Sequence, residues 1–111
     1  MPDPIDEATF DDLADGALRA LERALNDVDG IEVDLESGIL SIEFSDGDRF
    51  VVNSHRAARQ IWMAARASAW HFDVDAKTRR WTATKTGDEL WDCVQREIGE
   101  KLEQPLVLPR R

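Results

Sequence analysis

Residues 50–63 decide the fold of this chain, and they read FVVN (Phe50–Asn53), SHRAAR (Ser54–Arg59) and QIWM (Gln60–Met63). Two short apolar runs flank a polar connection. This pattern is typical of two neighbouring strands rather than of one helix. A sheet is therefore the centre of the predicted fold, and the segments on either side must cover it.

Trp62 is predicted to lie on the outward side of its strand. Side chains alternate across a strand, so if Ile61 and Met63 face a core, Gln60 and Trp62 face the other way. An outward tryptophan has two interpretations. It can form part of a binding surface, where tryptophan is enriched, or another part of the same chain can cover it.

A first helix is predicted from apolar residues that recur at helical spacing over residues 10–28. Asp3 can cap its start, or the helix can begin a few residues later, near Asp6 or Thr9. Gly30 follows an aspartate and suits a left-handed cap, so we expect the helix to end there.

Alternating apolar and polar residues over residues 31–83 predict five to six short strands. Ser37-Gly38 and Asp46-Gly47 are turn signals between them. The connections are too short for crossover helices, so the sheet should be antiparallel.

A second helix is predicted from Leu90 to Leu102, with its end marked by Pro105. Thr86 and Glu89 fit a capping box, in which Thr86 bonds the backbone N–H of Glu89. The fold class is therefore α+β: a two-layer α-β sandwich, with two terminal helices packed on one face of an antiparallel sheet of five to six strands. We expect a single domain over residues 1–111, whose other sheet face is open to water or to a partner.

The composition limits the partners. The formal net charge is −9, which repels nucleic-acid phosphates and anionic lipid and attracts metal cations and basic protein surfaces. We expect no nucleic-acid and no membrane partner. Cys93 is the one cysteine, so it cannot form an internal disulfide. The acidic start shows no secretory signal, and we expect a cytoplasmic protein.

Carboxylates gather on the first helix and on the first strand. If that strand lies at the sheet edge beside the helix, they share one ridge, and a bound cation would relieve their mutual repulsion. Carboxylate oxygens suit iron, manganese, magnesium or calcium. No closed cage is visible, so we expect a dissociation constant on the order of 10 μM. The alternative is a solvated acidic face.

The sequence shows no nucleophile motif, phosphate loop or paired acid and base, so we expect no enzyme. His55, placed in a loop, and His71, on the outward face of a strand, have no shared spacing. Cys93 lies beside the buried stripe of the second helix and is expected to fill the core. A haem- or metal-handling protein that uses His55, His71 or Cys93 is an alternative function, as is an acidic interaction adaptor without a metal role.

Several motifs resemble the frataxin family, in particular its bacterial CyaY-type members. They include the acidic first helix, Asn53 followed by QIWM at residues 60–63, and WHFD at residues 70–73. The resemblance continues through GILSIEF at residues 38–44, Trp81 and the Leu90-Trp91 start of the second helix. It runs nearly end to end and implies the sandwich predicted above.

The resemblance also implies a function. Family members bind ferrous or ferric iron weakly, dock on the cysteine desulfurase and scaffold of iron–sulfur cluster assembly, and modulate its rate without catalysis. We expect a monomer that bound metal can convert into oligomers. Arg23 and Asn26 stand where bacterial relatives tend to carry acids, which implies a lower iron capacity. The metal role falls to Glu22, Asp27, Asp29, Glu32 and Asp34, and the partner contact falls to Asn53, Gln60 and Trp62.

Overall fold

Helix α1 spans Glu7–Leu25 and begins at one of the three predicted starts. The structure is a computed structural model that describes residues 5–109. The Asp6 side chain accepts a hydrogen bond of 2.7 Å from the backbone N–H of Thr9 and caps the helix. Asp3, another of the predicted starts, lies outside the described residues.

The predicted end of α1 at Gly30 is wrong, because the helix ends at Leu25 with Asn26 as its C-cap. The N–H of Val28 donates to the carbonyl of Leu25 at 3.0 Å, an i to i+3 bond that tightens the chain into a turn. This turn brings Val28 against the core at nearly helical spacing. The apolar periodicity therefore continues past the last helical residue.

The sheet is a six-stranded antiparallel meander in which every strand pairs with its neighbour in sequence. The predicted α-β sandwich is confirmed, and the sheet has six strands, the upper end of the expected five to six. Glycines with positive φ make the first two turns, Gly38 at 78° and Gly47 at 94°. The strands are β1 (Ile31–Glu36), β2 (Ile39–Phe44), β3 (Arg49–His55), β4 (Gln60–Ala65), β5 (Ser68–Val74) and β6 (Trp81–Ala83).

Helix α2 spans Leu90–Leu102, and its cap differs from the predicted one. The Glu89 side chain itself caps the helix by accepting from the N–H of Asp92 at 3.1 Å. Thr86 bonds Asp88 within the preceding turn. Glu89 has an extended backbone and forms a bridge with Thr82, so it cannot occupy the third helical position that a capping box requires.

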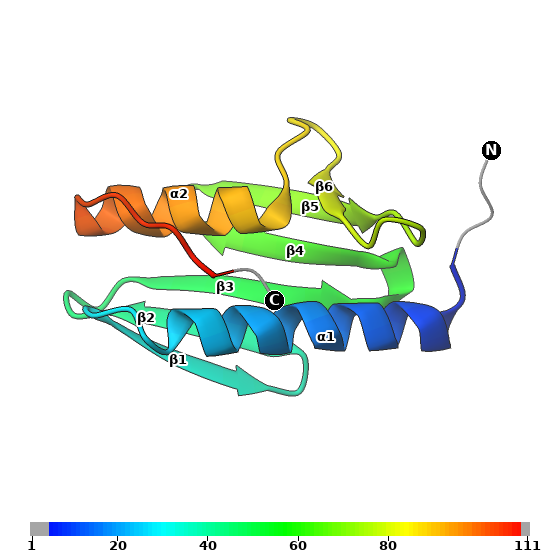
Figure 1. Cartoon of the computed structure of the whole chain (residues 1–111), viewed down its shortest axis with the longest axis horizontal. Coiled ribbons are helices and arrows are strands. Elements are labelled where there is room, and N and C mark those ends of the chain that lie inside the picture. Colours follow the sequence, from blue (N-terminus) through cyan, green and yellow to red (C-terminus); the bar gives the residue numbers. More distant parts are fainter. Residues whose placement is uncertain (1–4, 110–111) are drawn as a thin grey trace.

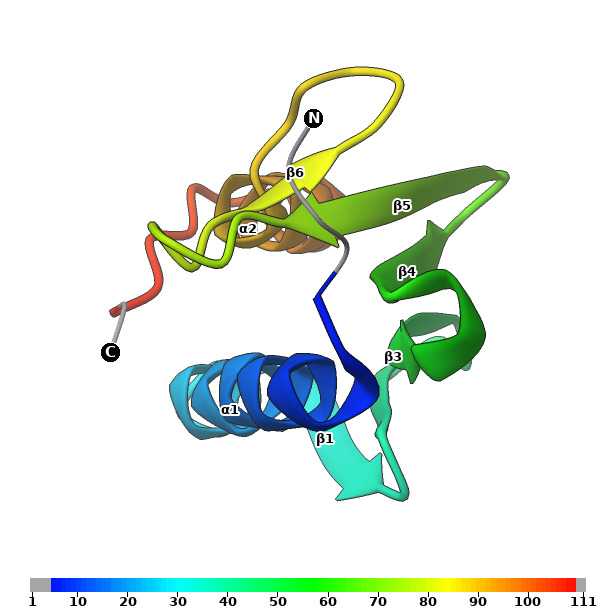
Figure 2. The same cartoon turned by 90° about the vertical axis from the view of Figure 1, so that its right-hand side faces the viewer.

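Both helices cover the same face of the sheet (Figures 1 and 2). Ile61 and Met63 are buried in the core between the layers, which confirms the predicted facing of β4. The C-terminal tail also lies against the core, since Leu108 is buried and Leu106 packs against it. Over residues 5–109, neither helix is long and apolar enough to cross a bilayer.

Candidate functional site

Strand β1 forms one edge of the sheet and packs against α1, as the acidic-ridge hypothesis required. Its apolar side chains are half-buried toward the helices, so Glu32 and Asp34 are exposed on the opposite, open face. Asp27 and Asp29 are exposed in the connection between α1 and β1, and Glu22 is half-buried on α1. The predicted metal residues therefore wrap around a sheet edge rather than share one flat surface.

The ridge does not form a closed metal cage. Across residues 5–109, no group of three or more His, Cys, Asp or Glu side chains converges in a way that could hold a metal ion. The donors are hard carboxylate oxygens, which fit iron and other hard cations. The arrangement can attract cations electrostatically, and it offers them single carboxylates or pairs.

Glu43 joins the ridge on the open face, although it was not among the predicted metal residues. It stands directly opposite Glu32 in the β1–β2 register, and Ser41 stands opposite Asp34. These side chains line a shallow cavity of about 350 Å³. Arg49 pairs with Glu43 at 3.6 Å and partly offsets its charge. The alternation of apolar and polar residues along β2 indicates that Glu43 faces outward. It does not predict the strand register that places Glu43 opposite Glu32.

The three predicted partner residues lie together on the open face of the sheet. Asn53 of β3 stands directly opposite Trp62 of β4. The Trp62 indole N–H donates to Gln60 Oε1 at 2.8 Å, and Gln60 Nε2 donates to Asp73 Oδ1 at 3.0 Å. Trp62 is half-buried on this face, so its predicted outward orientation is confirmed.

His55 and His71 stack on the two sides of Trp62. The His55 ring centroid lies 3.9 Å from that of Trp62 with an interplanar angle of 14°, and the His71 centroid lies 4.2 Å away at 12°. The prediction that His55 lies in a loop is wrong, because β3 extends through it to pair with Gln60. The two histidines have no shared spacing in the sequence, but the sheet register places both beside one indole.

These positions weaken the haem or metal hypothesis. The Trp62 ring lies between the two imidazoles, so they cannot ligate one metal ion without displacing it. Cys93 is fully buried in the core, as predicted. Burial raises the pKa of the Cys93 thiol to about 12, although nearby Arg96 opposes the shift. A protonated, buried thiol is a poor metal ligand and a poor nucleophile.

The open face also carries apolar surface near Trp62. Ile39 is 47% exposed, and it stands opposite Asn53 in the β2–β3 register. Ala64 and Ala69 are exposed and directly opposite each other on β4 and β5. A row of aromatic, amide and aliphatic side chains thus crosses the middle of the sheet, beside an acidic edge.

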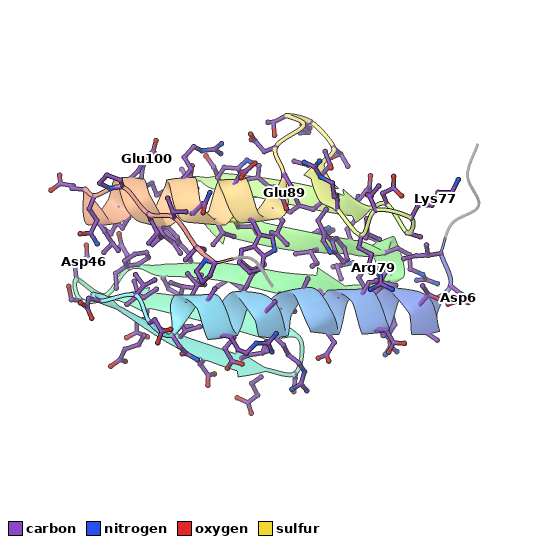
Figure 3. The ribbon with its side chains drawn as sticks, in the orientation of Figure 1. Asp6, Asp46, Lys77, Arg79, Glu89 and Glu100 are labelled. Carbon is purple, nitrogen blue, oxygen red and sulfur yellow. The ribbon has the colours of Figure 1, made fainter. Side chains whose placement is uncertain are left out.

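Ion pairs elsewhere hold the layers together. Lys101 of α2 donates to Asp46 at 2.5 Å and to Asp48, which fastens the end of the helix to the β2–β3 turn. Arg56 binds both carboxylate oxygens of Asp11, at 3.1 and 2.8 Å. Figure 3 shows Asp46, one of the partners of Lys101, at the opposite end of the molecule from Asp6, the N-cap of α1. We infer that these ion pairs contribute to the stability of the fold.

The chain folds as a small, acidic α-β sandwich, with both helices on one face of the sheet and the other face open. The chain belongs to the frataxin family: the model of the frataxin-like domain matches residues 3–104. This agrees with the resemblance expected from the sequence motifs.

Individual relatives cover almost the whole chain. The iron-sulfur cluster assembly protein CyaY of Azotobacter vinelandii is 37% identical over 105 residues, which cover 89% of this chain and 94% of the relative. That of Ralstonia nicotianae is 35% identical over 113 residues, 97% of each chain. The solved frataxin of Psychromonas ingrahamii superposes with a TM-score of 0.84 over 92% of this chain and 96% of its own, at 19% identity. This last likeness concerns the fold.

Proposed function

We propose that this protein is a non-catalytic component of iron–sulfur cluster assembly that binds ferrous or ferric iron weakly on the acidic ridge and docks on the cysteine desulfurase and its scaffold. The names of relatives at 35–37% identity support the assembly role. The observation that carries the docking role is the open sheet face, where Trp62, Gln60 and Asn53 lie together beside an acidic edge.

Electrostatics supports both parts of the proposal. A chain of net charge −9 attracts cations and basic protein surfaces, and Glu32 and Asp34 project from the open face toward solvent. Other divalent cations are expected to compete with iron, because isolated carboxylates discriminate poorly among hard ions.

Pull-down and calorimetry with the cognate cysteine desulfurase test the docking role. We expect binding by the native protein and at least tenfold weaker binding by a Glu32→Lys/Asp34→Lys double variant. The control is Asp12→Lys, which reverses one exposed carboxylate away from this edge, on the N-terminal half of α1. Absence of binding to the desulfurase, with and without its scaffold and iron, would refute the proposal.

Anaerobic titration with Fe²⁺, followed by ¹H–¹⁵N NMR, tests the metal role. Signal loss is expected to be confined to the ridge residues and to their immediate neighbours. The second candidate function, an acidic adaptor without a metal role, is favoured by one observation: no described group of three ligands converges. That candidate predicts no spectral change at an iron concentration well above 10 μM, and unchanged partner affinity when iron is added.

A further inference from the structure

Two histidines enclose the Trp62 indole in a three-ring stack on the open sheet face. Trp62 is almost parallel to both imidazoles, with centroid distances of 3.9 and 4.2 Å. We infer that His55 and His71 are positioning residues, which fix the indole so that a docking partner meets its rim rather than its face. The partner half of this inference rests on the proposed docking function; the positioning half does not.

The sheet register explains how the stack forms. His71 of β5 stands directly opposite Trp62 of β4, where side chains are nearest. His55 pairs with Gln60, so it lies diagonally from Trp62, within reach of a large aromatic ring. Three strands therefore contribute one ring each, and the rings stand side by side across the sheet.

Hydrogen bonds hold the indole within its own plane. Its N–H donates to Gln60 at 2.8 Å, and Gln60 is itself fixed by Asp73 at 3.0 Å. The two imidazoles restrain the indole perpendicular to that plane. Trp62 is thus held from both faces and at its indole N–H. Binding of a partner therefore costs little further side-chain conformational entropy.

His55 is held by the stack rather than by hydrogen bonds. Its Nδ1 atom is buried and has no hydrogen-bond partner in the described part of the chain. A buried polar atom without a partner is unfavourable, and the contact with the Trp62 ring opposes that cost. A planar ring is therefore the property of His55 that this position uses, and phenylalanine should be able to replace it.

The enclosed indole restricts the chemistry of the partner. Both faces are covered, so a partner arginine or lysine cannot stack on them as a cation–π contact. The rim that remains suits an apolar side chain. Ile39 is 47% exposed and lies in the same cross-strand row, with Asn53 between it and Trp62, so it adds aliphatic surface to the same face. The contact that fits is an apolar segment of the partner that extends across Asn53 from the Trp62 rim to Ile39.

The test compares His55→Ala and His71→Ala with His55→Phe and His71→Phe. The first readout is the indole N–H signal of Trp62 in ¹H–¹⁵N NMR, assigned with Trp62→Phe. The second is affinity for the cognate cysteine desulfurase. Each alanine variant should shift the indole signal and weaken binding about tenfold, or ~1.4 kcal/mol. Each phenylalanine variant should restore both, and Ser45→Ala, an exposed change in the β2–β3 turn, should change neither.

Three results would overturn the inference. An indole signal that neither alanine variant moves would mean that the histidines do not position the ring. Unchanged affinity despite a displaced ring would mean that its orientation is not used. Failure of both phenylalanine variants would mean that the imidazole nitrogens are needed. If the native protein bound no desulfurase, the proposed function would fail, and the NMR readout would still decide whether the histidines position Trp62.

Discussion

Glu32 and Glu43 stand directly opposite each other across β1 and β2, although both are negatively charged. Like charges in this position destabilise a sheet, and a bound cation would relieve the repulsion. The pair is exposed, so the cost is small and depends on salt.

Glu32→Gln should therefore raise the free energy of unfolding by about 0.2–1 kcal/mol at low salt. It should also weaken Fe²⁺ binding. Glu43→Gln is the matched control, because it removes the same repulsion but also the 3.6 Å ion pair with Arg49, worth ~0–1 kcal/mol. Its net stabilisation should be smaller. Urea denaturation at low and high salt measures both variants, and a destabilised Glu32→Gln protein would contradict the argument.

Trp62→Ala should lower stability only moderately, by about 1–3 kcal/mol, because it removes two aromatic contacts on an open face. Trp81→Ala is the comparison. Trp81 is 3% exposed and packs edge-on against Phe10, so its loss should cost about 3–5 kcal/mol. Thermal unfolding measures the difference, and equal losses would place Trp62 energetically in the core.

Gly16→Ala should stabilise the protein by about 0.5–1 kcal/mol. Gly16 lies inside α1, and an added Cβ would meet no atom within 4 Å. Gly38→Ala should do the opposite, because Gly38 has φ of 78° and its new Cβ would lie 2.6 Å from Ser54 Oγ. Chemical denaturation of both variants tests the pair; stabilisation by Gly38→Ala would show that the turn can rearrange.

Acid should weaken the contact between α2 and the β2–β3 turn. The hydrogen bond from Lys101 lowers the pKa of Asp46 below its usual value. Its stabilising contribution is therefore complete above the usual aspartate pKa of about 3.9 and is lost as the pH falls through the lowered, folded-state pKa. Asp46→Asn should make Tm less dependent on pH in this acidic range. A profile identical to that of the native protein would show that the ion pair adds nothing.

Cys93 should be unreactive in the native protein. The thiol is fully buried, and burial raises its pKa to about 12. Labelling with a thiol reagent at pH 8 should therefore proceed at the rate of unfolding and become fast in denaturant. Rapid labelling under native conditions would mean that α2 opens locally.

Features set by local periodicity could be predicted from the sequence, and features set by register could not. The alternation in QIWM was sufficient to place Ile61 inward and Trp62 outward, because a strand fixes facing within a few residues. The apolar spacing of α1 was misleading at its end, since the turn to Val28 preserves that spacing without being helical.

Long-range pairing accounts for the other differences. Thr86 and Glu89 fit a capping motif, but a bridge between Glu89 and Thr82 decided the conformation there. His55 and His71 are far apart in sequence, and only the pairing of β3, β4 and β5 brings them to Trp62. No spacing rule along a single strand could have revealed that contact. The individual metal and partner roles remain predictions.

The meander order of the sheet has a consequence for folding. Each strand pairs with the next one in the chain, so every hairpin can close over a short loop with little loss of chain entropy. The slower steps are those that bring the two helices, separated by the whole sheet, onto one surface. Until α2 docks, the apolar side chains of the sheet that it covers remain exposed to water. We expect the folding chain to be most prone to aggregation during that interval.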